Sequence, residues 1–248
     1  MLIKSEVKYI QNLSHKKFRD ETGHFVAEGP KLINELLASP KFELHRLYAT
    51  SEWFGMFPQR AASLPSDRIT QVSDSDLERI SFLATPHLVT GVFHLPENKE
   101  ISGRSTGLQL MLDTIQDPGN MGTIIRCADW FGISDILCSE NCADAFSPKV
   151  VQASMGSIAR VNVHYLSLEE YLHKNAGLPV FTAELTGKPV NAIGKINKGI
   201  LIIGNESKGI QPSLLASVPH TSVTIPRKGE AESLNAAVAT AVLLSHLT

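Results

Sequence analysis

The chain of 248 residues contains few cysteines, and their spacing matches no disulfide or metal-binding motif. Its three cysteines, Cys127, Cys138 and Cys142, are odd in number and include no CxxC pair. With nine histidines scattered along the sequence, this is neither a disulfide framework nor a spacing typical of a zinc site. We therefore expect buried, apolar thiols and no metal.

The sequence also lacks the features of exported and membrane proteins. Residues 1–10 alternate charged and apolar side chains and contain no apolar signal-peptide core. No apolar run approaches the roughly 20 residues that a membrane span needs. These absences predict a soluble, cytoplasmic protein. The net charge of −2 does not mark the whole chain as a nucleic-acid binder, although local patches decide such binding.

The first part of the chain alternates short helical and strand patterns. Helices are predicted where apolar residues recur at helical spacing, over 7–13, 31–37 and 75–83. Strands are predicted over 25–27, 47–49 and 88–93. From Pro96 to Gly107 the sequence then turns to Pro, Asn, Lys, Glu, Ser, Gly and Thr, so we expect a linker over residues 97–107. We expect a small α/β domain over residues 1–96.

The second part, residues 108–248, has a strong strand–loop–helix pattern. Strands are predicted over 108–115, 134–138, 161–165, 180–183, 200–204 and 223–225. Helices are predicted over 122–131, 147–157 and 233–247. Strands that are apolar on both faces and alternate with helices indicate a parallel sheet covered on both sides. Ligands bind such sheets at the carboxyl ends of the strands.

A first candidate loop follows the strand that starts at residue 108. A Pro-Gly turn leads into a helix that we expect to open at the glycine-bounded Asn120, and Arg126 lies on that helix. This arrangement suits an anion or a cofactor at a helix N-terminus, but a tight turn requires glycine for backbone reasons alone. Arg126 could form a bidentate contact with a phosphate.

Two further loops follow later strands. The loop Gly204–Gly209 begins like a phosphate-binding loop, but the Lys-Ser or Lys-Thr that such a loop requires is missing. Its Glu206 suits a hydroxyl or a cation, and a solvated turn is the alternative. The loop after Ile225 leads to a helix that is apolar almost all round, which suits a core or a subunit interface. Ser233 is the expected N-cap of that helix.

In this order the three loops resemble the motifs of the SpoU/TrmH branch of the SPOUT methyltransferases. The family's first motif, Asp-Pro-x-Asn-x-Gly and an Arg, is matched by Asp117, Pro118, Asn120, Gly122 and Arg126. Its second, Gly-x-Glu-x-x-Gly, is matched by Gly204, Glu206 and Gly209. Its third, Ile-Pro, a Gly and Ser-Leu-Asn, is matched by Ile225, Pro226, Gly229, Ser233, Leu234 and Asn235. Residues 146–156 are also similar, and the resemblance spans about 108–248.

The N-terminal part resembles the substrate-binding domain that precedes the catalytic domain in many of these enzymes, a domain that looks like a ribosomal RNA-binding protein. The similarity lies in residues 17–19 and 25–31. Basic side chains cluster nearby, and phosphate contacts are expected from Lys16, Lys17 and Arg19. A solvated charged surface is the alternative interpretation.

The resemblance implies a trefoil-knotted, parallel-sheet methyltransferase domain that forms a homodimer, with the active site completed across the interface. It implies that S-adenosyl-L-methionine is held by Gly204, Ile225, Leu234, Ala183 and Glu184. It also implies an activating role for Arg126. Because a guanidinium keeps its proton, we interpret that role as a clamp on the RNA phosphate that stabilises the developing alkoxide. The ribose, the arginine and the donor would be oriented by Asn120, Glu206, Ser233 and Asn235.

The expected function is methylation of a ribose 2′-hydroxyl in RNA, in rRNA rather than tRNA because of the N-terminal domain. A nucleotide-binding α/β enzyme is one alternative, but GxGxxG and GK[ST] motifs are missing. A non-catalytic RNA-binding homologue is another, although all three motifs are intact. Two positions depart from the family pattern: Arg227 replaces the usual Met, and Ala236 replaces a frequent Val. The sequence does not fix the methylated nucleotide.

Overall fold

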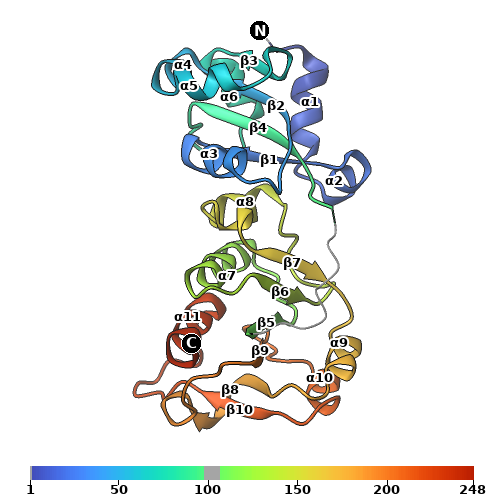
Figure 1. The fold of residues 1–248 in the computed structure, drawn as a ribbon, viewed down its shortest axis with the longest axis vertical. Helices are drawn as coiled ribbons and strands as arrows, with labels where there is room; N and C mark the ends of the chain where they lie inside the picture. Colours follow the sequence, from blue (N-terminus) through green and yellow to red (C-terminus); the bar gives the residue numbers. More distant parts are fainter. Residues whose placement is uncertain (1, 98–106) are drawn as a thin grey trace. The chain divides into compact units, whose positions relative to one another are not determined.

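The computed structural model describes residues 2–97 and 107–248, which form two compact units (Figure 1). The first unit contains the residues up to Glu97 together with Asp144–Ala159. The second contains the remaining residues. Most of the predicted linker, residues 98–106, lies outside the described residues, so the predicted division at 97–107 stays a prediction.

The first unit is built on a four-stranded sheet of order β1-β4-β2-β3. Strand β4 (Val89–His94) is antiparallel to β1 (His24–Glu28) and to β2 (Leu44–Ala49), and β3 (Ile69–Gln71) is parallel to β2. The helices are α1 (Lys4–Asn12), α2 (Lys16–Thr22), α3 (Pro30–Ala38), α4 (Ser51–Met56), α5 (Pro58–Ser63), α6 (Asp74–Ile80) and α8 (Pro148–Ala153). The predicted α/β alternation of the N-terminal part is present.

Apolar side chains cover both faces of this sheet. On one face, Val26 and Val92 pack with Val7 and Ile10 of α1 and with apolar residues of α6. Phe25 and Phe93, next to these valines in their strands, point to the opposite face, where their rings stack. The ring centroid of Phe146 lies 5.0 Å from that of Phe25. Each fully buried side chain of this kind contributes roughly 1.5–3 kcal/mol. Residues 144–159 are therefore part of the first unit's core.

Arg19 holds this distant segment in place. Its side chain is only 2% exposed, and its guanidinium forms an ion pair with Asp144. The same guanidinium donates to the carbonyl oxygens of Leu13 and Ser14 at 2.7 and 2.9 Å. The expected phosphate contact of Arg19 is therefore wrong, because its nitrogens are buried and already bonded.

The other two predicted RNA contacts lie on the surface of α2. The Nζ atom of Lys16 is 2.7 Å from a carboxylate oxygen of Asp20, and that of Lys17 is 3.9 Å from Glu21. Both lysines are exposed, so they are accessible to RNA. Since each already has an acidic neighbour one turn away, the helix is less basic than the sequence run indicated.

A buried carboxylate ends strand β1. Glu28 is 4% exposed and accepts hydrogen bonds from the Phe82 backbone N–H at 2.8 Å and from the Ser81 hydroxyl at 2.5 Å. Burial raises the pKa of this carboxyl above its ordinary value, because desolvation penalises the charged form more than the two hydrogen bonds favour it.

The second unit is a six-stranded, wholly parallel sheet of order β10-β8-β9-β5-β6-β7. Its strands are β5 (Leu108–Leu112), β6 (Asp135–Cys138), β7 (Asn162–Tyr165), β8 (Val180–Pro189), β9 (Gly199–Ile203) and β10 (Thr221–Thr224). The helices are α7 (Pro118–Trp130), α9 (Leu168–Lys174), α10 (Pro212–Ala216) and α11 (Ala236–Leu247). The predicted parallel sheet is confirmed.

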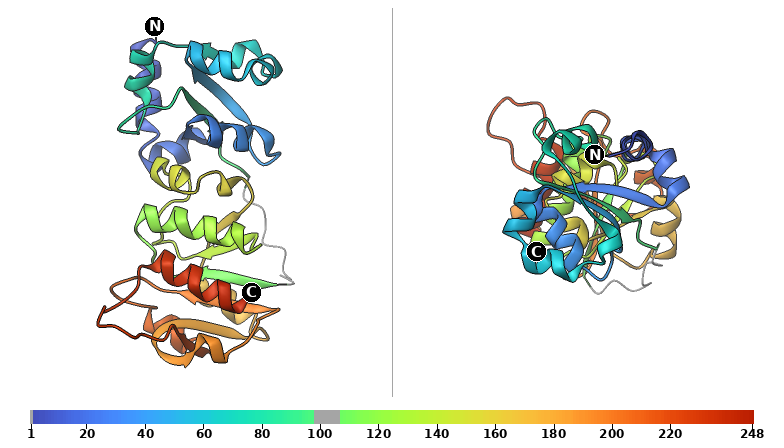
Figure 2. Two further views of the ribbon diagram at one scale, coloured as in Figure 1. Left: turned by 90° about the vertical axis from the view of Figure 1, so that its left-hand side faces the viewer. Right: turned by 90° about the horizontal axis from the view of Figure 1, so that it is seen from above.

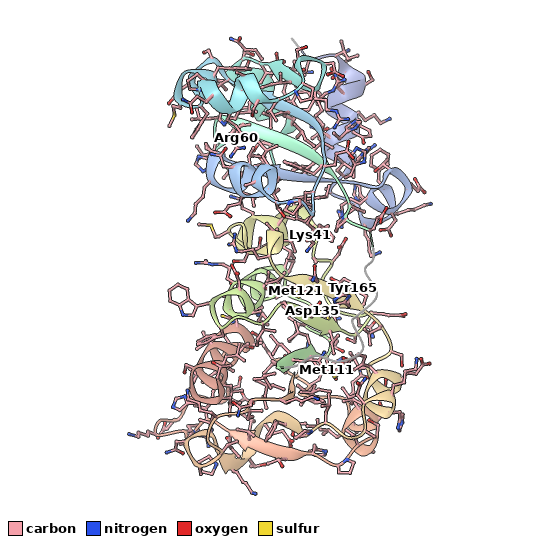
Figure 3. The ribbon with its side chains drawn as sticks, viewed as in Figure 1. Lys41, Arg60, Met111, Met121, Asp135 and Tyr165 are labelled. Carbon is pink, nitrogen blue, oxygen red and sulfur yellow. The ribbon has the colours of Figure 1, made fainter. Side chains whose placement is uncertain are left out.

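Helices lie along both faces of this sheet. Helices α7 and α11 lie side by side in both figures (Figures 1 and 2). Apolar residues of α9 and α10 pack on β5, β8 and β9 in a second cluster. Met111 of β5 and Met121 of α7, labelled in Figure 3, are completely buried. None of the described helices is long and apolar enough to cross a membrane.

Several element boundaries differ from the predicted ones. Helix α7 begins at Pro118 rather than Gly122, because the Asp117 side chain caps it by accepting from the Asn120 N–H at 2.8 Å. Strand β5 ends at Leu112, ahead of Thr114, whose φ of +58° turns the chain. Helix α11 is capped by Asn235, so the prediction of Ser233 as its N-cap is wrong.

Candidate functional site

Three loops that follow strands of the second unit meet at one edge of the sheet. They follow β5, β9 and β10, and β5 and β9 are direct neighbours. Since all the strands are parallel, their carboxyl ends lie at the same edge, where open α/β sheets bind ligands. The topology therefore brings the three predicted motifs together.

The centre of this edge is a hydrogen-bonded set of three side chains, one from each loop. The Asn120 amide donates to Oε1 of Glu206 at 2.6 Å. The Asn235 amide donates to the same oxygen at 3.0 Å and to the Asn120 carbonyl oxygen at 2.7 Å. We call Asn120, Glu206 and Asn235 the polar triad. The motifs predicted each of these residues separately, and the structure brings them into contact.

The triad is anchored at the start of helix α11. Oε1 of Glu206 also accepts a hydrogen bond from the Ala236 backbone N–H at 3.0 Å. The side-chain oxygen of Asn235 accepts from Ala237 N and Val238 N at 3.0 and 3.2 Å. The first N–H groups of a helix have no partner within it, and a carboxylate is favoured beside them. The helix N-terminus therefore fixes two members of the triad.

A tight loop places Glu206 over the sheet edge. Asn205 and Gly209 exchange two backbone hydrogen bonds of 3.0 and 2.8 Å, and Glu206 lies between them in the chain. A Cβ atom on Gly204 would lie 2.4 Å from the backbone carbon of Gly209 and 2.5 Å from Ile210 N. Only glycine fits this close approach, which explains the first residue of the second motif.

Two residues that the motifs did not single out tie the first loop to the second. Asp113 is 1% exposed and accepts from Gln211 N at 2.7 Å and from the Gln211 side chain at 2.9 Å. The Asn205 side chain donates to the Thr114 carbonyl at 2.9 Å. The signal for Asp113 was present, since an acidic residue directly after an apolar strand requires a partner when it is buried.

Arg126 and Ser233 lie outside the polar triad. Arg126 is exposed on α7, six residues beyond Asn120, which places it about 9 Å along the helix and about 240° around it. Within the part of the chain that the structure describes, neither the Arg126 nor the Ser233 side chain forms a hydrogen bond or an ion pair. The structure thus unites three of the five predicted catalytic residues and leaves two apart.

The predicted donor-binding residues lie near the ends of adjacent strands. Ala183 and Glu184 lie in β8, Gly204 directly follows β9 and Ile225 directly follows β10. Leu234, just before α11, is 46% exposed. Oε1 of Glu184 already accepts from the Thr182 and Ser222 hydroxyls at 2.6 and 2.7 Å, so this carboxylate is held by its own strand and by β10.

Strand β8 departs from regular pairing where donor contacts were predicted. Thr182 pairs with Ser222, but the next pair along β10 joins Val223 to Lys188. The intervening residues of β8 leave the ladder, and Leu185 among them is 74% exposed. The predicted strand ended at residue 183, where this departure begins.

The histidines also gather in a way that the sequence did not indicate. Potential ligand nitrogens of His24, His45 and His94, all in the first unit, lie within 4.8 Å of one another. Because these residues are 21 and 49 positions apart in the chain, spacing alone gave no signal for the cluster.

The fold and the three loops define an α/β enzyme that binds its ligands at the strand ends of a parallel sheet. Two family models match the chain and specify the class further. The SpoU rRNA methylase family matches residues 107–245, and an MRM3-like substrate binding domain matches residues 4–91. The chain belongs to the SpoU rRNA methylase family and is an RNA methyltransferase, which confirms the resemblance found in its motifs.

Similar proteins match this chain over different shares of their own length. The chain is 34% identical, over 98% of its length and 95% of the relative, to the 23S rRNA (guanosine(2553)-2′-O)-methyltransferase RlmP of Bacillus subtilis. It is 32% identical to the mitochondrial rRNA methyltransferase 3 of Xenopus tropicalis, over 71% of this chain and 44% of that protein.

Two solved structures of methyltransferases have the same fold over nearly the whole chain. A putative RNA methyltransferase of the TrmH family from Porphyromonas gingivalis is 39% identical, with a TM-score of 0.85 over 99% of this chain and 97% of that one. An AdoMet-bound rRNA methyltransferase from Sinorhizobium meliloti is 30% identical, with a TM-score of 0.86 over 98% and 94%.

Proposed function

We propose that this protein transfers a methyl group from S-adenosyl-L-methionine to a ribose 2′-hydroxyl of ribosomal RNA. The observation that carries the proposal is the polar triad, in which one residue from each of three family motifs meets at one sheet edge. The relatives support rRNA over tRNA, since the Bacillus subtilis and Xenopus proteins are both named as rRNA methyltransferases.

The residues at the strand ends fit the methyl donor. An adenosine needs apolar surface and backbone polar groups, and the exposed Leu234 lies in the chain between Ile225 and α11. Gly204 lets the backbone close tightly beside this edge. We assign donor binding to Gly204, Ile225 and Leu234, together with Ala183 and Glu184 of β8. The donor, when bound, supplies an activated methyl group for in-line displacement.

The protein's own residues then have to position the ribose. Correct alignment of reacting atoms is worth about 7–11 kcal/mol, so a rigid frame is the main requirement. The triad supplies such a frame, because its members hold one another and the first turn of α11. Arg126 clamps the RNA phosphate and stabilises the developing negative charge, and Ser233 contacts the bound RNA or donor.

The position of Arg126 favours a homodimer formed by the C-terminal domain. Arg126 lies on an exposed stretch of α7, outside the triad of its own chain. Trp130, one turn further along α7, is 85% exposed, and Val238 on the adjoining α11 is 49% exposed. Aromatic side chains such as Trp130 are enriched in the interfaces between subunits. In a dimer through this surface, Arg126 of one subunit would serve the triad of the other.

Three further features belong to the proposal. The first 96 residues form the RNA substrate-binding domain, which the family match over residues 4–91 supports, and Lys16 and Lys17 contact RNA there. The C-terminal domain, residues 108–248, contains the trefoil knot that the family resemblance implies. We also infer that the protein works in the cytoplasm.

Methyl transfer by single-residue variants tests the catalytic assignment. With labelled donor and unmethylated rRNA, Arg126→Ala should lose transfer by at least about 100-fold, the cost of a missing charge-stabilising donor, while calorimetry shows nearly unchanged donor affinity. The control Lys174→Ala removes an exposed charge from α9 and should retain activity. Wild-type turnover by Arg126→Ala would refute its role, and methylation of tRNA alone would refute the rRNA assignment.

Donor binding and assembly are tested separately. Leu234→Glu should weaken donor binding, and an unchanged affinity would show that the pocket is misplaced. Light scattering should give twice the chain mass for the wild type and a monomer for the double variant Trp130→Glu/Val238→Glu. Met56→Glu, a control at an exposed apolar residue of α4, should remain dimeric. A monomeric wild type would contradict the dimer.

A further inference from the structure

Three histidines from three adjacent strands meet at one end of the N-terminal sheet. His24 begins β1 and is paired directly with His94, the last residue of β4. Residues directly opposite in an antiparallel pair have their side chains on the same face, so these two imidazoles are neighbours. Nε2 of His24 lies 3.2 Å from Nδ1 of His94.

A register shift brings in the third histidine. Leu44 pairs with Phe93 and Arg46 with Val92, so that His45 is an extra residue in β2. A bulge of this type re-aims a side chain that regular pairing would place on the other face. The His45 ring stacks on that of His24 with centroids 4.1 Å apart, and its centroid is 5.5 Å from that of His94.

From this geometry we propose that His24, His45 and His94 form a binding site for a divalent transition-metal ion, with Zn²⁺ as the expected occupant. One potential ligand nitrogen from each histidine lies within 4.8 Å of the others. Two nitrogens bound to one tetrahedral zinc ion are about 3.3 Å apart, since each Zn–N bond is about 2.0 Å. The 3.2 Å between His24 and His94 matches that spacing.

Tyr9 orients one of the ligands. Its hydroxyl lies 2.5 Å from Nδ1 of His24. A proton on Nδ1 donated to this hydroxyl leaves the lone pair on Nε2, the nitrogen that faces His94. Metal-bound histidines nearly always use their second ring nitrogen in this way, to fix the ring and its tautomer.

The surroundings do not oppose a cation. Arg46 and Arg68 lie nearby, but each has a carboxylate partner, Glu6 at 3.4 Å and Glu43 at 2.8 Å. With three protein ligands and partly exposed rings, the fourth position is left for water or another small ligand.

The site is tested by calorimetric titration of the full-length protein with Zn²⁺. The protein carries no polyhistidine tag and is first treated with a chelator to remove bound metal. The wild type should bind one Zn²⁺ per chain. Tyr9→Phe, which keeps the ring and removes the hydroxyl, should weaken binding about 10- to 100-fold, the usual effect of losing an outer partner. His45→Gln and His94→Gln each remove a ligand and should weaken it by more than about 100-fold.

The matched control is His173→Gln, at an exposed histidine of α9, which should bind as the wild type does. Circular dichroism establishes that each variant is folded, and His45, which is partly exposed, is the substitution that disturbs packing least. Co²⁺ in place of Zn²⁺ should give the visible absorption of a tetrahedral site with the wild type and lose it with His45→Gln. No Zn²⁺ binding by the wild type, or equal affinity in folded His45→Gln, would overturn the proposal.

Discussion

Removal of the Glu206 carboxylate should destabilise the protein measurably, because one oxygen accepts three hydrogen bonds. The donors are the Asn120 and Asn235 amides and the Ala236 backbone N–H, at 2.6, 3.0 and 3.0 Å. A hydrogen bond to a charged group is worth about 1.5–3 kcal/mol when it is protected from water. Because Glu206 is exposed, we expect about 2 kcal/mol for all three together.

For a chain of this size, about 2 kcal/mol lowers the melting temperature by about 4–8 °C. Glu206→Ala should show this shift in differential scanning calorimetry. Glu206→Gln keeps an acceptor oxygen in the same place and should lose about half as much, since charged hydrogen bonds are about twice as strong as neutral ones. Glu140→Ala, an exposed acidic residue elsewhere in the same unit, is the control and should melt like the wild type.

Two outcomes would refute this reasoning. If Glu206→Ala melts within about 1 °C of the wild type, far less than the shift worked out above, the triad does not stabilise the start of α11. If Glu206→Gln and Glu206→Ala lose the same amount, the negative charge at the helix N-terminus, rather than the three hydrogen bonds, carries the effect.

Two further predictions concern buried charges in the first unit. Arg19→Met leaves Asp144 without its ion-pair partner and should lower the free energy of unfolding by about 3 kcal/mol, the low end for a broken buried ion pair. Adding Asp144→Asn to the same chain should restore part of the melting temperature, and no restoration would contradict the pairing. Glu28→Gln should raise the melting temperature at pH 7.5. A carboxyl with a raised folded-state pKa contributes stability at low pH and loses it as the pH rises through that value, so the gain should shrink on acidification; a pH-independent gain would contradict the burial effect.

The sequence predicted the parallel sheet for a clear physical reason, and it predicted the members of the triad one by one through their match to the family's motifs. Strands such as β9 (Gly199–Ile203) are buried along their whole length, and an uninterrupted apolar run is the signal for that environment. Asn120, Glu206 and Asn235 each lie beyond the end of a predicted strand, and a parallel sheet places the ends of its strands at one edge. The hydrogen bonds between them could not be derived, since they depend on side-chain directions that loop sequences do not encode.

Other features needed the tertiary structure. From the sequence, Arg19 is expected to be a surface charge in a basic run. Only the fold shows that it is buried and paired with Asp144, 125 positions away. Ser233 has the right type for an N-cap, but α11 begins only at Ala236, and Asn235 is the residue whose side chain bonds to its first N–H groups. The histidine cluster arises from strand pairing and from one bulge, and neither leaves a local pattern in the sequence.

The contribution of residues 144–159 to the first unit has a consequence for how the protein is made. The ring of Phe25 packs on Phe146, and Arg19 forms its ion pair with Asp144. A nascent chain that ends near residue 97 therefore lacks both contacts. Residues 144–159 are synthesised only after strands β5 and β6 of the second unit have been translated. Neither unit is therefore encoded by one continuous stretch of sequence, and the first unit receives its last core segment after part of the second has been made.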